Sequence, residues 1–283
     1  MRTAMLMALM GALMVMVGKA LGGNQGAGIF LMISLAMNIY FYWCSDSMVL
    51  RQYNAKELTE SSAPGLYKMV QRLANNAKIP MPKLYLINTD VPNAFATGRN
   101  PEHAAVAVNR GLADMLTMDE LEGVLAHEIS HIKHRDILIS TVAGCMATVI
   151  SYLAQVAQWA MIFGGGRRDD DDNGGVLGSI FAIIIAPIAA SLIQMAISRS
   201  REYEADRSGG EISGKPDALA DALLKIENYA QHRIMPNASE TTAHMFIINP
   251  FSAKKLKSMF STHPSTEERV KLLREQARKM GRL

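Results

Sequence analysis

The sequence predicts a mainly helical α+β protein with about four transmembrane helices and a cytoplasmic part that carries a small β-sheet. Three observations predict this class. Hydrophobic residues make up 49% of the 283 residues, and the mean hydropathy of +0.08 is high for a soluble protein of this length. Four apolar runs approach the length of about 20 residues that spans a bilayer. Short strand-like runs separated by turn residues lie between the second and the third of them.

The first two apolar runs predict an N-terminal transmembrane hairpin over residues 1–44. They cover residues 4–21 and 27–43, and each is close to bilayer-spanning length. The first run lacks a small-x-small cleavage site, and the second run follows closely. We therefore expect a retained hairpin rather than a signal peptide.

Residues 45–136 predict a cytoplasmic part with a small sheet and one long helix. Residues 84–89, 93–97 and 104–109 have the composition of short strands and are separated by turn residues. A capping box from Thr117 to Glu120 predicts the start of the helix, because a hydroxyl and an acid at this spacing satisfy the first free N–H groups.

A second hydrophobic hairpin is predicted over residues 137–198. Its apolar runs cover residues 137–163 and 176–197, and the Gly- and Asp-rich residues 164–175 between them are typical of a solvated linker. Both runs contain polar residues, so either can partly line a cavity or a protein interface instead of facing lipid throughout.

The distribution of basic residues predicts the orientation in the membrane. Residues 45–136 hold 10 Lys and Arg, and residues 199–283 hold 15, so these two stretches contain 25 of the 29. By the positive-inside rule we expect both stretches in the cytoplasm. The net charge of +3 is too small and too dispersed to indicate a nucleic-acid partner.

The motif His127-Glu128-Ile129-Ser130-His131 carries the strongest chemical signal. On a helix, His127 and His131 lie on one face and one turn apart, so two neutral imidazoles can bind one Zn²⁺. Glu128 is not needed as a ligand and is expected to face the open coordination position. There it can act as the general base that takes a proton from water and passes it to the leaving amine.

A third ligand is expected just after the last apolar run, in the polar segment from Ser198 to Asp206. Glu202 can complete a two-histidine, one-glutamate site for one zinc ion per chain. Asp206 lies one helical turn further on, where it can orient a ligand imidazole through its other nitrogen. Glu204 points about 200° away from Glu202 around a helix, so both carboxylates cannot face the same metal.

The chain resembles the HtpX heat-shock membrane metalloproteases, relatives of the CAAX prenyl proteases in the gluzincin group. The resemblance is carried by three features in order: HEISH, a hydrophobic hairpin and then S-R-x-x-E-Y-x-A-D. The resemblance includes residues 93–98 and 262–269 and covers nearly the whole chain. It implies a gluzincin-type zinc endopeptidase in the bacterial inner membrane. Such an enzyme acts from the cytoplasmic side on misfolded or damaged membrane proteins, with other membrane quality-control proteases as partners.

Two further roles are predicted for residues around this motif. His263 is our candidate for a second donor to the oxyanion, and the alternative is a histidine packed before the capping box that starts at Ser265. Asn93, Ala94, Phe95 and Ala96 are expected to form an edge strand that pairs with the substrate main chain. For this strand the alternative is ordinary sheet core.

Two other functions compete with the peptidase. A site-2-type intramembrane metalloprotease also uses HExxH but buries it in an apolar span, whereas Glu120, Glu122 and Lys133 lie around this motif. A non-catalytic, zinc-stabilised membrane adaptor or holdase would have a closed site and no need for Glu128.

Overall fold

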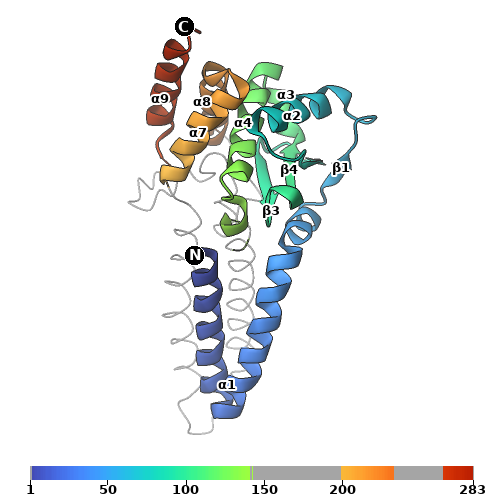
Figure 1. Cartoon of the computed structure of the whole chain (residues 1–283), viewed down its shortest axis with the longest axis vertical. Coiled ribbons are helices and arrows are strands. Elements are labelled where there is room, and N and C mark those ends of the chain that lie inside the picture. The colour runs from blue at the N-terminus through green and yellow to red at the C-terminus, as the bar shows by residue number, and fades with distance from the viewer. Residues whose placement is uncertain (1, 141, 143–198, 233–263, 283) are drawn as a thin grey trace.

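The computed structural model describes residues 2–140, 142, 199–232 and 264–282. In this part the chain is mainly helical with one small mixed sheet, as predicted. A long helical hairpin forms one end of the molecule, and the sheet and the other described helices gather at the opposite end (Figure 1). Most of the predicted second hairpin, including its linker, and His263 lie outside the described residues.

Helix α1 (Arg2–Gln52) consists of two helical legs that lie side by side (Figure 1). The helix is broken at Gly22 and Gly23, and the φ of +60° at Gly23 is a conformation that glycine adopts without strain. The legs come so close that a Cβ added at Gly18 would lie 2.5 Å from the carbonyl oxygen of Gly26. Small residues at this point therefore allow the hairpin to close.

In the described part of the chain, no helix combines the length and the apolar character that crossing a membrane requires.

The sheet has four strands in the order β1-β2-β4-β3. Strands β2 and β4 are parallel, whereas β1 pairs with β2 and β3 pairs with β4 in antiparallel orientation. Three strands were predicted to within two residues at each end, but β1 was not, since its three residues are too few to show alternation. The bounds are β1 (Lys56–Leu58), β2 (Lys83–Ile87), β3 (Ala94–Gly98) and β4 (Ala104–Asn109).

Helices α2, α7 and α8 and strand β3 pack against α4, and α9 packs against α7 and α8. Buried side chains of α2, α4, α8 and β4 form one hydrophobic core, in which Leu73, Val106, Leu125 and Leu223 are fully buried. The helices are α2 (Pro64–Ala77), η1 (Pro101–His103), α3 (Arg110–Met115), α4 (Met118–Lys133), α7 (Arg199–Ser213), α8 (Pro216–His232) and α9 (Thr266–Lys279).

Helix α4 begins at the predicted capping box. The Thr117 hydroxyl accepts the Glu120 N–H at 3.4 Å, and the Glu120 carboxylate accepts the Thr117 N–H at 2.8 Å. The sequence pattern predicted one apolar face, but the helix is buried from residue 120 to 130 because other elements surround it. Two of its acids are buried and paired with lysines: Glu120 contacts Lys225 at 2.7 Å, and Glu122 contacts Lys215 at 2.7 Å.

Candidate metal centre

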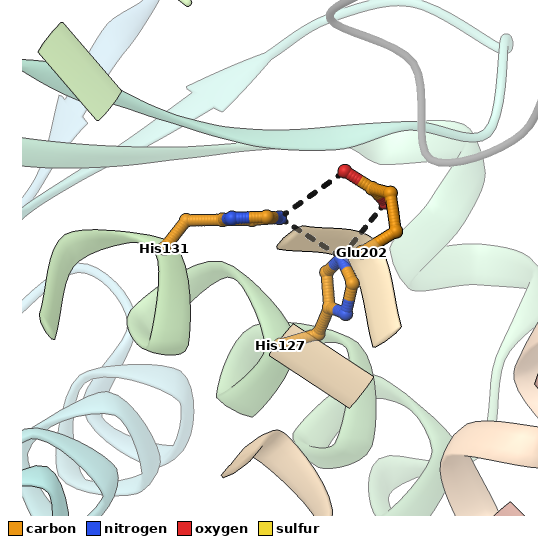
Figure 2. A group of neighbouring side chains, drawn as sticks. All are labelled: His127, His131 and Glu202. Atoms are coloured by element: carbon orange, nitrogen blue, oxygen red, sulfur yellow. Dashed lines mark hydrogen bonds and ion pairs between the residues drawn. The ribbon is translucent and has the colours of Figure 1, made fainter. Parts of the chain in front are cut away.

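Two helices supply three side chains that converge on one point. His127 and His131 come from consecutive turns of α4, and Glu202 comes from the first turn of α7. Figure 2 shows both imidazoles and the carboxylate pointing toward one another. The two Nε2 atoms lie 3.2 Å apart, and each lies 3.7 Å from an oxygen of Glu202.

This arrangement fits a tetrahedral metal ion. Zinc bonds of about 2.1 Å at tetrahedral angles place ligand atoms about 3.4 Å apart, close to the three distances found. One ligand atom from each residue lies within 4.8 Å of the others. Two imidazoles and one carboxylate also leave one coordination position for water or substrate, which is the pattern of catalytic zinc sites.

A close approach between α4 and α7 brings the three side chains together. A Cβ added at Gly209 would lie 2.9 Å from the backbone nitrogen of His127. Because Glu202 and Gly209 are seven residues apart, they lie on the same face of α7. The glycine therefore lets this face, including Glu202, approach the histidine helix.

Asp206 lies behind His127, on the side away from the metal position. Its Oδ1 is 2.9 Å from Nδ1 of His127, the second nitrogen of the ring. Arg269 of α9 binds Asp206 through two contacts of 2.7 Å. Burial opposes ionisation of Asp206, but the charge and hydrogen bonds of Arg269 outweigh burial and hold the pKa of Asp206 well below its usual range.

The sequence interpretation assigned no role to Arg269, which is 1% exposed. Ser265 caps α9 as predicted, and its hydroxyl accepts the Glu268 N–H. A signal was present nonetheless, because Arg269 is in helical register with Leu273 and Ala277, the buried apolar residues of α9. A charged residue on the apolar stripe of a helix requires a buried partner.

A second carboxylate, also absent from the predicted site, contacts His131. Oδ2 of Asp136 lies 3.3 Å from Nδ1 of this ring. Burial works against a charged imidazole here, but Asp136, Glu202 and Glu128 outweigh it and raise the pKa of His131 to about 9. A metal ion must therefore displace a proton from this ring at neutral pH.

Glu128 lies beside the three-residue group without belonging to it. Its Oε2 accepts the backbone N–H of Ala96 at 2.9 Å. Burial, together with the charge of Glu202, raises the pKa of the Glu128 carboxyl, although both histidines and the Ala96 N–H oppose the shift. The residue is thus held by the sheet rather than by the ligand residues.

Strand β3, which donates this N–H, is an edge strand of the sheet. The carbonyl of Asn93 accepts the N–H of Asn109 on β4. In an antiparallel pair such bonds alternate, so Ala94 and Ala96 direct their main-chain groups toward the free edge. Phe95 is buried and packs against Tyr53, with ring centroids 5.7 Å apart, so it serves the core as well.

Glu204, the rival carboxylate of the sequence interpretation, lies outside the metal group, and so does the nearby His134. His134 caps the end of α4, and its Nδ1 lies 3.2 Å from the Ser130 hydroxyl. Glu204 pairs with Arg207 at 2.6 Å. Neither side chain is directed at the point where His127, His131 and Glu202 meet.

Comparison with known proteins gives consistent results. A relative from Methylibium petroleiphilum called "Protease HtpX homolog" is 55% identical over 272 residues, 95% of each chain. Relatives with the same name from Paraburkholderia phytofirmans and Pyrococcus furiosus are 53% and 52% identical, and the alignments cover 98% and 99% of this chain and 96% of theirs. The resemblance to the HtpX proteases is thereby confirmed.

The fold is similar to that in "Crystal Structure of S. mikatae Ste24p", with a TM-score of 0.53 at 18% identity. That alignment covers 96% of this chain and 64% of the other. The sequence profile of Peptidase family M48 matches residues 60–277, which include both histidines, Glu128, Glu202 and Asp206. The chain therefore belongs to Peptidase family M48 and is a metalloprotease.

Proposed function

We propose that this metalloprotease is a zinc-dependent membrane endopeptidase that hydrolyses misfolded or damaged membrane proteins from the cytoplasmic side. The observation that carries the proposal is the convergence of His127, His131 and Glu202, with Glu128 beside them and outside the ligand set. In a structural zinc site four ligands close the coordination sphere, whereas three ligands and an adjacent acid are typical of catalysis.

Glu128 performs the proton transfers in this proposal. When bound, zinc acts as a Lewis acid that makes water a better nucleophile and polarises the scissile carbonyl. Glu128 takes a proton from the attacking water and passes it to the amine that leaves. Its raised pKa makes the Glu128 carboxylate a stronger base than a free glutamate, which favours the first of these steps.

The contact between Glu128 and Ala96 positions the base relative to the substrate strand. Because the Ala96 N–H is 2.9 Å from Oε2, the carboxylate is fixed to the edge of the sheet. A peptide added to this edge would pair with the outward main-chain groups of Ala94 and the carbonyl of Ala96, next to the base. Main-chain pairing requires little sequence preference, which suits an enzyme that removes damaged proteins.

Sequence features support the membrane location. The apolar runs at residues 4–21 and 27–43, and the concentration of Lys and Arg in residues 45–136 and 199–283, favour a multi-pass protein with a cytoplasmic site. The inner membrane of bacteria is the proposed location, and other quality-control proteases of that membrane are proposed partners. His263 is proposed as an additional oxyanion donor.

The competing functions have less support. A site-2-type enzyme would surround its motif with apolar membrane residues, but α4 carries Glu120 and Glu122, both buried as ion pairs. An adaptor or holdase would need no base, and Glu128 lies where a base is useful. Membership of a peptidase family also favours hydrolysis.

The test compares the purified, zinc-reconstituted full chain with its Glu128→Gln variant on an unfolded membrane-protein substrate. We expect both proteins to bind one zinc ion and only the wild type to hydrolyse. Glu202→Gln should lose zinc, whereas Glu204→Gln, a change of a half-buried carboxylate on the same helix, should retain it. Equal turnover by Glu128→Gln would exclude Glu128 as the base, and full zinc retention by Glu202→Gln would exclude it as a ligand.

A further inference from the structure

The turn that ends α4 folds Asp136 back onto the last ligand of that helix. Arg135 adopts a left-handed conformation with φ of +60°, and its N–H donates to Ile132 at 3.1 Å. The N–H of Asp136 donates to the carbonyl of His131 at 2.9 Å. These two bonds form a Schellman motif, which brings the backbone of Asp136 next to that of His131.

The side chains continue this contact. A carboxylate only accepts hydrogen bonds, so Nδ1 of His131 must be the donor in its 3.3 Å contact with Asp136. When Nδ1 carries the proton, the neutral ring keeps its lone pair on Nε2. Nε2 is the atom that faces His127 and Glu202.

Asp136 is itself held from the other helix. Nε of Arg201 lies 3.7 Å from Oδ1 of Asp136, and the two side chains are only 14% and 16% exposed. Arg201 directly precedes Glu202 in α7. The contact therefore links the end of α4, which carries one ligand, to the turn of α7 that carries another.

Local helix stability gives no reason for an acid here. The C-terminus of a helix carries partial negative charge, which disfavours a carboxylate. A non-glycine residue in the left-handed conformation adds strain at Arg135. Asp136 is therefore better explained by its contact with His131 than by the stability of α4.

We propose that Asp136 is the positioning residue for His131, fixing the tautomer and orientation of this ring, and that Arg201 holds Asp136 in place. The inference rests on the proposed function, because it assumes that His131 binds a metal ion. Each histidine of the centre then has its own carboxylate and arginine: Asp206 and Arg269 lie behind His127, and Asp136 and Arg201 lie behind His131.

The test measures zinc affinity in the full-length Asp136→Asn variant by competition with a chelator. Asparagine has nearly the same shape but lacks the charge that holds the Nδ1 proton. We expect zinc binding to weaken about 10- to 100-fold, the usual effect of removing an outer carboxylate. The thermal midpoint should fall less in the zinc-free protein than in the zinc-loaded protein, and the absorption bands of the Co²⁺-substituted protein should shift.

Two further variants separate positioning from folding. Arg201→Gln should weaken zinc binding in the same direction but less, because Asp136 remains. Arg135→Gly keeps the left-handed turn and should leave zinc affinity unchanged. Wild-type zinc affinity in Asp136→Asn, or an equal loss of midpoint with and without zinc, would overturn the inference. Absence of zinc binding by the wild type would overturn the proposed function as well.

Discussion

The close approach at Gly209 gives a quantitative prediction for Gly209→Ala. The new Cβ would lie 2.9 Å from the His127 nitrogen, whereas ordinary van der Waals contact begins at 3.4 Å. The neighbouring atoms belong to the backbone of α4 and cannot rotate away, so α7 must move outward by about 0.5 Å, the difference between these distances. Glu202 lies on the same face and would move with it.

This displacement should appear mainly in metal binding. The distances of 3.7 Å from Glu202 to the two imidazoles would exceed about 4 Å, too long for a zinc ion bound to all three. Overpacking of this kind costs about 1–3 kcal/mol. The zinc-free protein can relieve the overpacking by moving α7 outward. Zinc binding draws the ligands together and restores the close contact, so most of this cost opposes zinc binding. Zinc affinity should then fall about 5- to 150-fold.

The assay is zinc titration by chelator competition, combined with chemical denaturation of the zinc-free protein in detergent. Gly65→Ala is the matched control, because Gly65 is also helical but an added Cβ would have no atom within 4 Å. We expect unchanged zinc affinity and equal or slightly higher stability in the control. Wild-type zinc affinity in Gly209→Ala would refute the reasoning.

Two other predictions concern stability. Arg269→Leu removes the buried cation that pairs with Asp206, so the free energy of unfolding should fall by about 3–5 kcal/mol. Arg274→Leu breaks a partly exposed pair and should change the free energy of unfolding by less than about 1 kcal/mol; similar losses in the two variants in denaturant titrations would contradict this. Burial opposes ionisation of Glu122, yet Lys215 and Arg72 lower its pKa below the ordinary 4.5. The stability that the Glu122 carboxylate contributes is therefore complete above pH 4.5 and is lost as the pH falls through its lowered pKa. Lys215→Met should reduce this loss of stability in acid, measured by unfolding curves at several pH values. An unchanged pH dependence would argue against the pairing of Glu122 with Lys215.

Much of the site could be predicted because its signals are local. The i, i+4 spacing of His127 and His131 fixes their common face on any helix. The capping box at Thr117 fixes where that helix starts. The residue composition located strand β3. Which of its N–H groups point away from β4, and so allow Ala96 to donate to Glu128, follows from the register of β3 with β4.

Other parts of the site gave no usable local signal. Asp136 follows the helix in a turn whose left-handed residue is Arg135, where a glycine would have indicated a Schellman motif. Arg269 lies on a mostly polar helix and is 63 residues from its partner Asp206. Only its register with two buried residues distinguished it from the exposed arginines of α9.

By itself the sequence predicted the two histidine ligands, their helical spacing, the base beside them and the apolar runs, since each depends on residues within a few turns of one another. The tertiary structure alone decided that α4 is buried on nearly all sides and that Gly209 lets α7 approach it. It also decided that the imidazole next to Asp206 is that of His127, and that Asp136 contacts the other one. These features depend on the distance between helices that are far apart in the chain, and that distance is set by packing, which local periodicity does not encode.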